Sequence, residues 1–186
     1  MLRALTRGFL ASATLVAIAT SSLAAQTAPV VADLIKDVDG VQQKLVALAK
    51  AVPQEKYSWR PSAGVRSISE VFLHVVSDNY LMPALAGAAI PANMKLDMKD
   101  MKSFSVFEKR TVTREQAVAE LEASFAFLKA AMQKSTAADM SAMVDMFGTK
   151  STKQSMWVGT TTHLHEHLGQ SIAYARMNGV VPPWSK

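Results

Sequence analysis

Residues 162–170 read Thr-His-Leu-His-Glu-His-Leu-Gly-Gln and lie in a long segment near the end of the sequence. This segment runs from about Thr152 to Asn178. Gly179 follows where a helix C-cap is expected, and Pro182-Pro183 prevents the helix from continuing. The sequence therefore predicts a long final helix that carries three of the four histidines of the chain.

Three earlier segments carry apolar side chains at helical spacing, and each predicts a helix. The first covers roughly residues 30–51 and stops at Pro53. The second opens at a capping-box pair, Ser67 with Glu70, and runs to about residue 86 with a kink expected at Pro83. The third opens at the pair Thr113 and Gln116 and has its apolar positions at steps of three and four residues: Val118, Leu121, Phe125, Leu128, Met132.

Two long connections join these helices. Residues 87–112 form a crossover between the second and third helices, and the Met-rich residues 137–150 precede the final helix. No segment shows sustained alternation of apolar and polar residues. The predicted fold class is therefore all-α, a four-helix bundle with one long crossover, and residues 26–186 form a single domain.

The N-terminal segment, residues 1–25, has the pattern of a secretory signal peptide. Arg3 and Arg7 precede an apolar stretch, and small residues offer cleavage after Ala24 or Ala25. We expect an exported protein, periplasmic or secreted, with no membrane attachment after cleavage. An uncleaved anchor is the alternative, but five Ser and Thr residues make the stretch a poor spanning helix.

Net charge and cysteine content limit the partners and metal ligands that the chain can have. The chain of 186 residues has a formal charge of +5, and two of those charges are Arg3 and Arg7. The remaining +3 forms no basic stripe, which argues against a nucleic-acid partner. There is no cysteine, so a metal site would have to use histidine and oxygen ligands.

The histidine spacing permits a metal site without requiring one. His163 and His167 stand at i and i+4, so both rings can reach one ion, whereas His165 points roughly 160° away on a regular helix. His74 stands alone among apolar residues of the second helix, and a third ligand from a facing helix would complete the site. The alternative is a solvated histidine pair with His74 as a core residue. No Glu-x-x-His, His-Glu-x-x-His or Gly-x-Ser-x-Gly motif is present.

Several motifs in order along the chain resemble the DinB-like superfamily of four-helix-bundle metalloenzymes. They are Trp-Arg-Pro at 59–61, Gly-Val-Arg-Ser-Ile-Ser-Glu at 64–70, Leu-His-Val at 73–75, His-Leu-His-Glu-His-Leu-Gly-Gln at 163–170, Tyr-Ala-Arg-Met-Asn-Gly at 174–179 and Val-Pro-Pro at 181–183. The resemblance implies a divalent metal bound by His74, His163 and His167. Two positions depart from the usual pattern, Glu166 where many members have histidine and Leu168 where many have a basic residue.

Residues near these ligands are weaker candidates for a catalytic role. Asp78 lies one turn after His74 and could act as a base or be a surface residue. Tyr174, with Gln170, could line the open side of the metal or fill the bundle. Glu70 is better explained as the capping-box acid, and Gly169 is expected to permit close approach of a helix.

The resemblance implies metal-dependent hydrolysis or thiol-dependent transfer, in which the metal lowers the pKa of water or of a substrate thiol. Zn²⁺ or Ni²⁺ is the expected metal, with Fe²⁺ or Mn²⁺ as alternatives. The substrate would be an unidentified small molecule. A non-catalytic exported binding protein is the second hypothesis, and a bundle whose role is to form a homodimer is the third.

Overall fold

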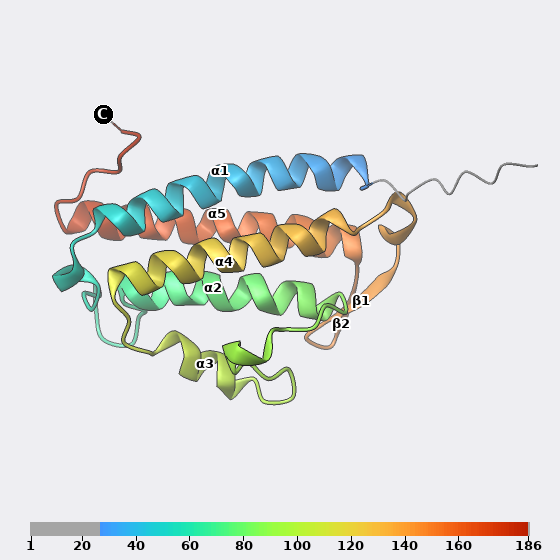
Figure 1. The fold of residues 1–186 in the computed structure, drawn as a ribbon, viewed down its shortest axis with the longest axis horizontal. Coiled ribbons are helices and arrows are strands. Elements are labelled where there is room, and N and C mark those ends of the chain that lie inside the picture. Colours follow the sequence, from blue (N-terminus) through green and yellow to red (C-terminus); the bar gives the residue numbers. More distant parts are fainter. Residues whose placement is uncertain (1–26, 186) are drawn as a thin grey trace, which may run out of the picture.

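The computed structural model describes residues 27–185, so the predicted signal peptide lies outside the described residues. Within that range four long helices form a bundle: α1 (Pro29–Ala51), α2 (Ile68–Leu85), α4 (Arg114–Gln133) and α5 (Lys153–Met177). Helices α1 and α2 each pack against both α4 and α5, so α1 and α2 occupy opposite corners. Figure 1 shows α1 and α5 running in one direction and α2 and α4 in the other. The predicted four-helix bundle is confirmed.

Capping hydrogen bonds fix where α2 and α4 begin. The Ser67 hydroxyl accepts from the Glu70 amide at 3.2 Å, and the Glu70 carboxylate accepts from the Ser67 amide at 2.7 Å. Thr113 and Gln116 make the same reciprocal pair at the start of α4. Each pair satisfies two backbone donors that the first helical turn leaves without a partner. Both predicted capping boxes are therefore present.

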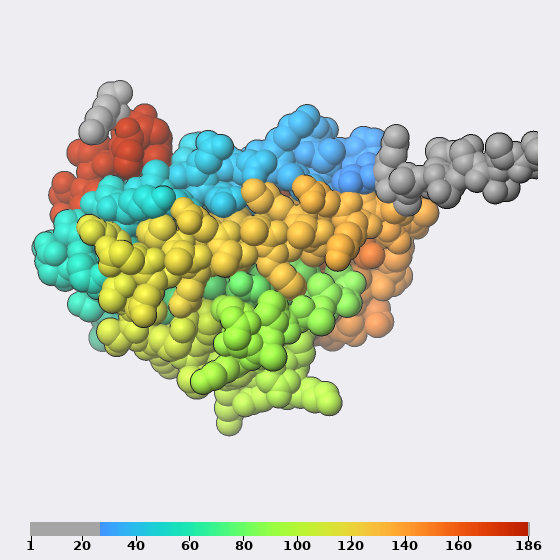
Figure 2. Space-filling model, viewed as in Figure 1, coloured from blue at the N-terminus to red at the C-terminus, as the bar shows by residue number. Residues whose placement is uncertain are grey.

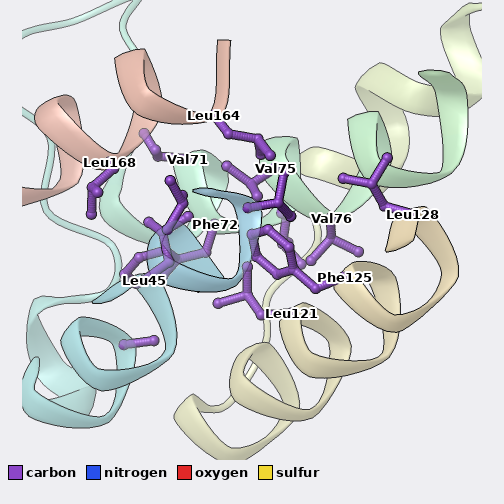
Figure 3. Packing of buried hydrophobic residues seen from close by; sticks show 14 of the residues in the cluster. Leu45, Val71, Phe72, Val75, Val76, Leu121, Phe125, Leu128, Leu164 and Leu168 are labelled. Carbon is purple, nitrogen blue, oxygen red and sulfur yellow. The ribbon is translucent and has the colours of Figure 1, made fainter. Parts of the chain in front are cut away.

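The core lies on the bundle axis and receives side chains from all four long helices (Figure 3). Leu45 of α1, Phe72 of α2, Phe125 of α4 and Leu164 of α5 are each no more than 2% exposed. They come from the apolar stripes of their helices, which point inward at steps of three and four residues. This packing holds α2 and α5 side by side, which matters for the histidines described below.

The crossover between α2 and α4 contains a short helix, α3 (Lys102–Glu108), preceded by a single 3₁₀ turn, Ala92–Met94. Phe104 and Phe107 are buried at 5% exposure, and α3 packs against α2. In Figure 2 the crossover, coloured green to yellow-green, covers the bundle below α4. Because α2 and α4 run parallel, the chain has to return along the bundle between them, and this segment makes that return.

The Met-rich connector before α5 folds as an antiparallel hairpin. Strands β1 (Met143–Met146) and β2 (Thr149–Thr152) pair with Met143 opposite Thr152. Phe147 and Gly148 form the turn, both with positive φ, as a tight two-residue hairpin requires. The remaining 3₁₀ turns are Gln54–Lys56 and Ala137–Asp139. Among the described residues, none of the helices has the length and apolar character needed to span a membrane.

Candidate metal centre

Three histidines from two helices converge between α2 and α5. His74 comes from the middle of α2, and His163 and His167 come from successive turns of α5. One ring nitrogen from each lies within 4.8 Å of the other two. The ring centroids are 4.4–5.4 Å apart, and each pair of ring planes is close to perpendicular, at 82–87°. The structure thus brings together the three residues expected as ligands, and this cluster could hold a metal ion.

The spacing of the nitrogens fits a bound ion. The Nε2 atoms of His163 and His167 are 3.1 Å apart. Two imidazole nitrogens that share a tetrahedral zinc ion at about 2.1 Å lie about 3.4 Å apart. All three rings are partly buried, so the bundle holds them in place without sealing them from solvent.

Two of the rings are also held by hydrogen bonds at Nδ1, the ring nitrogen opposite the one that faces the cluster. The Nδ1 of His74 donates to the Glu108 carboxylate at 2.8 Å, and the Nδ1 of His167 donates to the Gln170 side-chain oxygen at 2.9 Å. A proton held on Nδ1 leaves Nε2 as the nitrogen with a free electron pair, which is the tautomer that binds metals. The hydrogen bonds therefore hold His74 and His167 with Nε2 available to an ion.

Asp78 lies on the same side as the Nε2 atoms. Its Oδ2 accepts from His163 Nε2 at 2.8 Å and is 3.4 Å from His74 Nε2. The hydrogen bond to Asp78 raises the pKa of His163, whereas burial lowers the pKa of His167 to about 4. A metal would therefore have to displace the proton that His163 shares with Asp78, so binding should release protons.

Glu108 on α3 is the residue of the candidate site that the sequence does not reveal. One carboxylate oxygen accepts from His74, and the other accepts from Arg66 Nε at 2.9 Å. Burial alone would raise the pKa of Glu108, but its hydrogen bonds and ion pairs with His74 and Arg66 lower it. Phe104 and Phe107 stand three residues apart, which is a helical spacing, and this spacing is a sequence signal that could have indicated the short helix that carries Glu108.

Tyr174 and His165 lie near the three histidines but do not contact them directly through hydrogen bonds. The Tyr174 hydroxyl accepts from the Gln170 amide at 3.1 Å, and the Tyr174 ring packs edge-on against Trp59. Tyr174 thus supports Gln170 and makes no direct hydrogen bond to the histidines. His165 bonds to Asp37 of α1 at 3.0 Å, which confirms that it is not part of the cluster.

The expectation for Gly169 was wrong. A Cβ atom at that position would have no neighbouring atom within 4 Å. The residue is exposed on α5, so no helix needs to approach it closely.

The chain is thus a helical bundle with three convergent histidines, on its second and last long helices, that could hold a metal ion. The family model of the DinB superfamily matches residues 37–171, and this chain belongs to that superfamily. The predicted family resemblance is confirmed. Among curated proteins, no match to the chain is found.

Solved structures show the same fold. A DinB-like protein from Bacillus cereus aligns with a TM-score of 0.62 and 16% identity, covering 81% of this chain and 93% of that one. A DinB-like protein from Bacillus subtilis aligns with a TM-score of 0.59 and 18% identity, over 79% and 92% of the two chains. A conserved protein from Enterococcus faecalis gives a TM-score of 0.65 and 16% identity, over 78% and 94%. At these identities the likeness establishes the fold.

Proposed function

We propose that this protein binds one divalent metal ion through the Nε2 atoms of His74, His163 and His167. The observation that carries the proposal is the convergence of the three rings, two of them with Nδ1 tied to an acceptor. Such an arrangement favours an ion that accepts imidazole ligands, and Zn²⁺ or Ni²⁺ is the first choice, ahead of Fe²⁺ or Mn²⁺.

We further propose that the site is catalytic, in a hydrolase or in a thiol-dependent transferase acting on a small molecule. A bound divalent metal would supply Lewis-acid chemistry and lower the pKa of a water molecule or thiol. Asp78 is 12% exposed at its side chain and adjoins two of the Nε2 atoms, so it can accept the proton released there. Glu108 and Gln170 hold the rings that border the reacting groups.

Metal content tests the binding proposal directly. The purified protein should carry close to one metal ion per chain by elemental analysis, and the double variant His163→Ala/His167→Ala should carry almost none. His165→Ala is the matched control, because His165 lies on the same helix but bonds to Asp37. A near-zero content in the unaltered protein, even after reconstitution with Zn²⁺ and Ni²⁺, would refute the site.

A non-catalytic binding protein is the second candidate function, and the number of protein ligands to the metal separates the two functions. A site closed by four protein ligands is typical of a structural metal, whereas a site with an open position is typical of an enzyme. A crystal structure of the zinc-loaded protein measures this difference, because it distinguishes a carboxylate ligand from a water molecule. Asp78 as a fourth protein ligand would favour the structural role, and three histidines with water would favour catalysis.

We propose that the protein is exported to the periplasm or secreted, on the basis of the pattern in residues 1–25. N-terminal sequencing of exported protein should give a chain that begins at Ala25 or Gln26. The proposed partner is a small molecule rather than a nucleic acid, because the chain has no basic stripe. A homodimer would reveal itself as a melting temperature that depends on protein concentration.

A further inference from the structure

A cavity of about 540 Å³ lies between the α1–α2 connector, α3 and α5. Three cations line it, Arg60 and Arg66 from the connector and Lys109 just after α3. Two carboxylates share its wall, Glu70 and Glu108. Both Arg60 and Arg66 have side chains 41% exposed, so a small solute can reach them.

The charges in this cavity leave an excess of one positive charge. Arg60 pairs with Glu70 at 3.0 Å and Arg66 pairs with Glu108 at 2.9 Å, so each carboxylate is balanced by one guanidinium and Lys109 supplies the third cation. Lys109 makes no ion pair with any described residue.

Arg66 also retains unused hydrogen-bond donors. Its Nε donates to Glu108 at 2.9 Å, while its two terminal nitrogens donate to no group among residues 27–185. Arg60, by contrast, uses both terminal nitrogens, to the Val65 carbonyl and to Glu70. A guanidinium with free terminal donors matches the paired oxygens of a carboxylate or phosphate.

The cavity adjoins the histidine cluster through two of its wall residues. Glu108 accepts from His74, and Gln170 accepts from His167. Both of these residues line the cavity. A group bound against Arg66 and Lys109 is thus separated by a single side chain from two of the three rings.

We propose that this cavity is a subsite for an anionic group, carboxylate or phosphate, of the small-molecule substrate. The assignment as a substrate subsite rests on the proposed catalytic function, whereas anion binding itself does not. Arg66 and Lys109 supply charge and donors to the anion, and the reacting part of the substrate lies toward the histidines.

The test is an NMR titration of the full chain with sodium phosphate and, separately, with sodium acetate, at constant ionic strength. The Nε–H signal of Arg66 and the amide signal of Lys109 should shift and saturate. Lys109→Gln should weaken binding about threefold and Arg66→Gln about tenfold. Lys44→Gln is the matched control, since Lys44 is exposed on α1 away from the cavity, and it should bind as the unaltered protein does.

Equal dissociation constants for Lys109→Gln and Lys44→Gln would overturn the proposal, as would shifts that never saturate. This comparison stands even if Arg66→Gln fails to fold, because Lys109 is exposed. The stronger of the phosphate and acetate responses identifies the anion class. Binding that disappears in the folded His163→Ala/His167→Ala variant would place the anion on a metal and refute the cavity. Anion binding that is retained in an unaltered protein that takes up no Zn²⁺ or Ni²⁺ on reconstitution would leave the cavity intact while the metal proposal fails.

Discussion

Glu108 is the single residue through which the crossover holds a candidate metal ligand. It accepts from His74 Nδ1 at 2.8 Å while Arg66 binds its other oxygen. Glu108→Gln keeps the shape but removes the charge, so the His74 ring becomes less basic and less firmly oriented. We expect metal affinity to fall about 10- to 100-fold in a titration against a competing chelator. Glu122→Gln removes an exposed carboxylate on α4 and should leave the affinity unchanged.

An equal affinity in Glu108→Gln and in the unaltered protein would show that the carboxylate does not support the ligand. A loss in both glutamine variants would point to a general effect of charge. Comparing the metal affinities of the two variants therefore separates the effect of losing the Glu108–His74 contact from the effect of changing the net charge of the protein.

His167 should make the metal-free protein less stable in acid. Burial lowers its pKa in the folded state from 6.5 to about 4. Between these two values the unfolded chain binds more protons, so the free energy of unfolding falls as the pH drops through that range. The contribution of His167 is about 2 kcal/mol after allowance for its partial exposure. The raised pKa of His163 acts in the opposite sense, favouring the folded state below pH 6.5.

Urea unfolding at pH 7.5 and pH 4.5, with chelator present, measures this effect. His167→Gln should lose less stability between the two pH values than the unaltered protein does. An unchanged or larger loss in His167→Gln would show that other groups control the acid sensitivity. His165→Gln serves as a control on the outer face of α5.

The candidate ligands and the nearby Asp78 and Gln170 could be named from the sequence, but Glu108 could not. His163 and His167 share one helix, so their spacing alone shows that they face the same way. His74 needed the family resemblance, because nothing in its own neighbourhood says which helix it faces. Glu108 is 34 residues from His74 and reaches it only because α3 docks on α2. Local patterns carry no information about such a contact.

At the scale of elements, α3 is a short helix held by its aromatic side chains. Phe104 and Phe107 are buried, and Arg110 stacks 3.9 Å above the Phe107 ring. A helix of seven residues is not stable alone in water, so its packing must hold it. Phe107→Ala should cost about 3 kcal/mol in the free energy of unfolding and also weaken metal binding through Glu108.

Val106→Ala is the matched control for this prediction, because Val106 lies on the same helix and is 69% exposed. It should change the free energy of unfolding by less than about 0.5 kcal/mol. Urea unfolding and the chelator titration give both readouts. Full metal affinity in Phe107→Ala would show that α3 positions Glu108 without needing this anchor.

Element length explains which parts of the fold were predictable. The four long helices have 18–25 residues, enough for a repeated apolar stripe to stand out from chance. Helix α3 has seven residues, and each hairpin strand has four. In β1 only Val144 is buried, so no alternation accumulates. Such short elements are stable only when they pack against the rest of the protein, and the local sequence does not show what they will pack against.

At the scale of the whole molecule, the histidine cluster joins two helices that are far apart in sequence. His74 belongs to α2, whereas His163 and His167 belong to α5, and the two helices pack side by side. An ion held by all three residues therefore links the two helices in the folded state. The unfolded chain does not hold the three rings together, so it binds the ion more weakly.

Metal binding should consequently raise the melting temperature. At a free metal concentration 100 times the dissociation constant, the gain is about 2.7 kcal/mol, which corresponds to about 5–10 °C for a chain of this size. Calorimetry with Zn²⁺ and with chelator measures the difference. His74→Ala should abolish the increase because it removes the ligand on α2, while His165→Ala should retain it. An increase that persists in His74→Ala would mean that the ion binds to α5 alone and does not join the two helices.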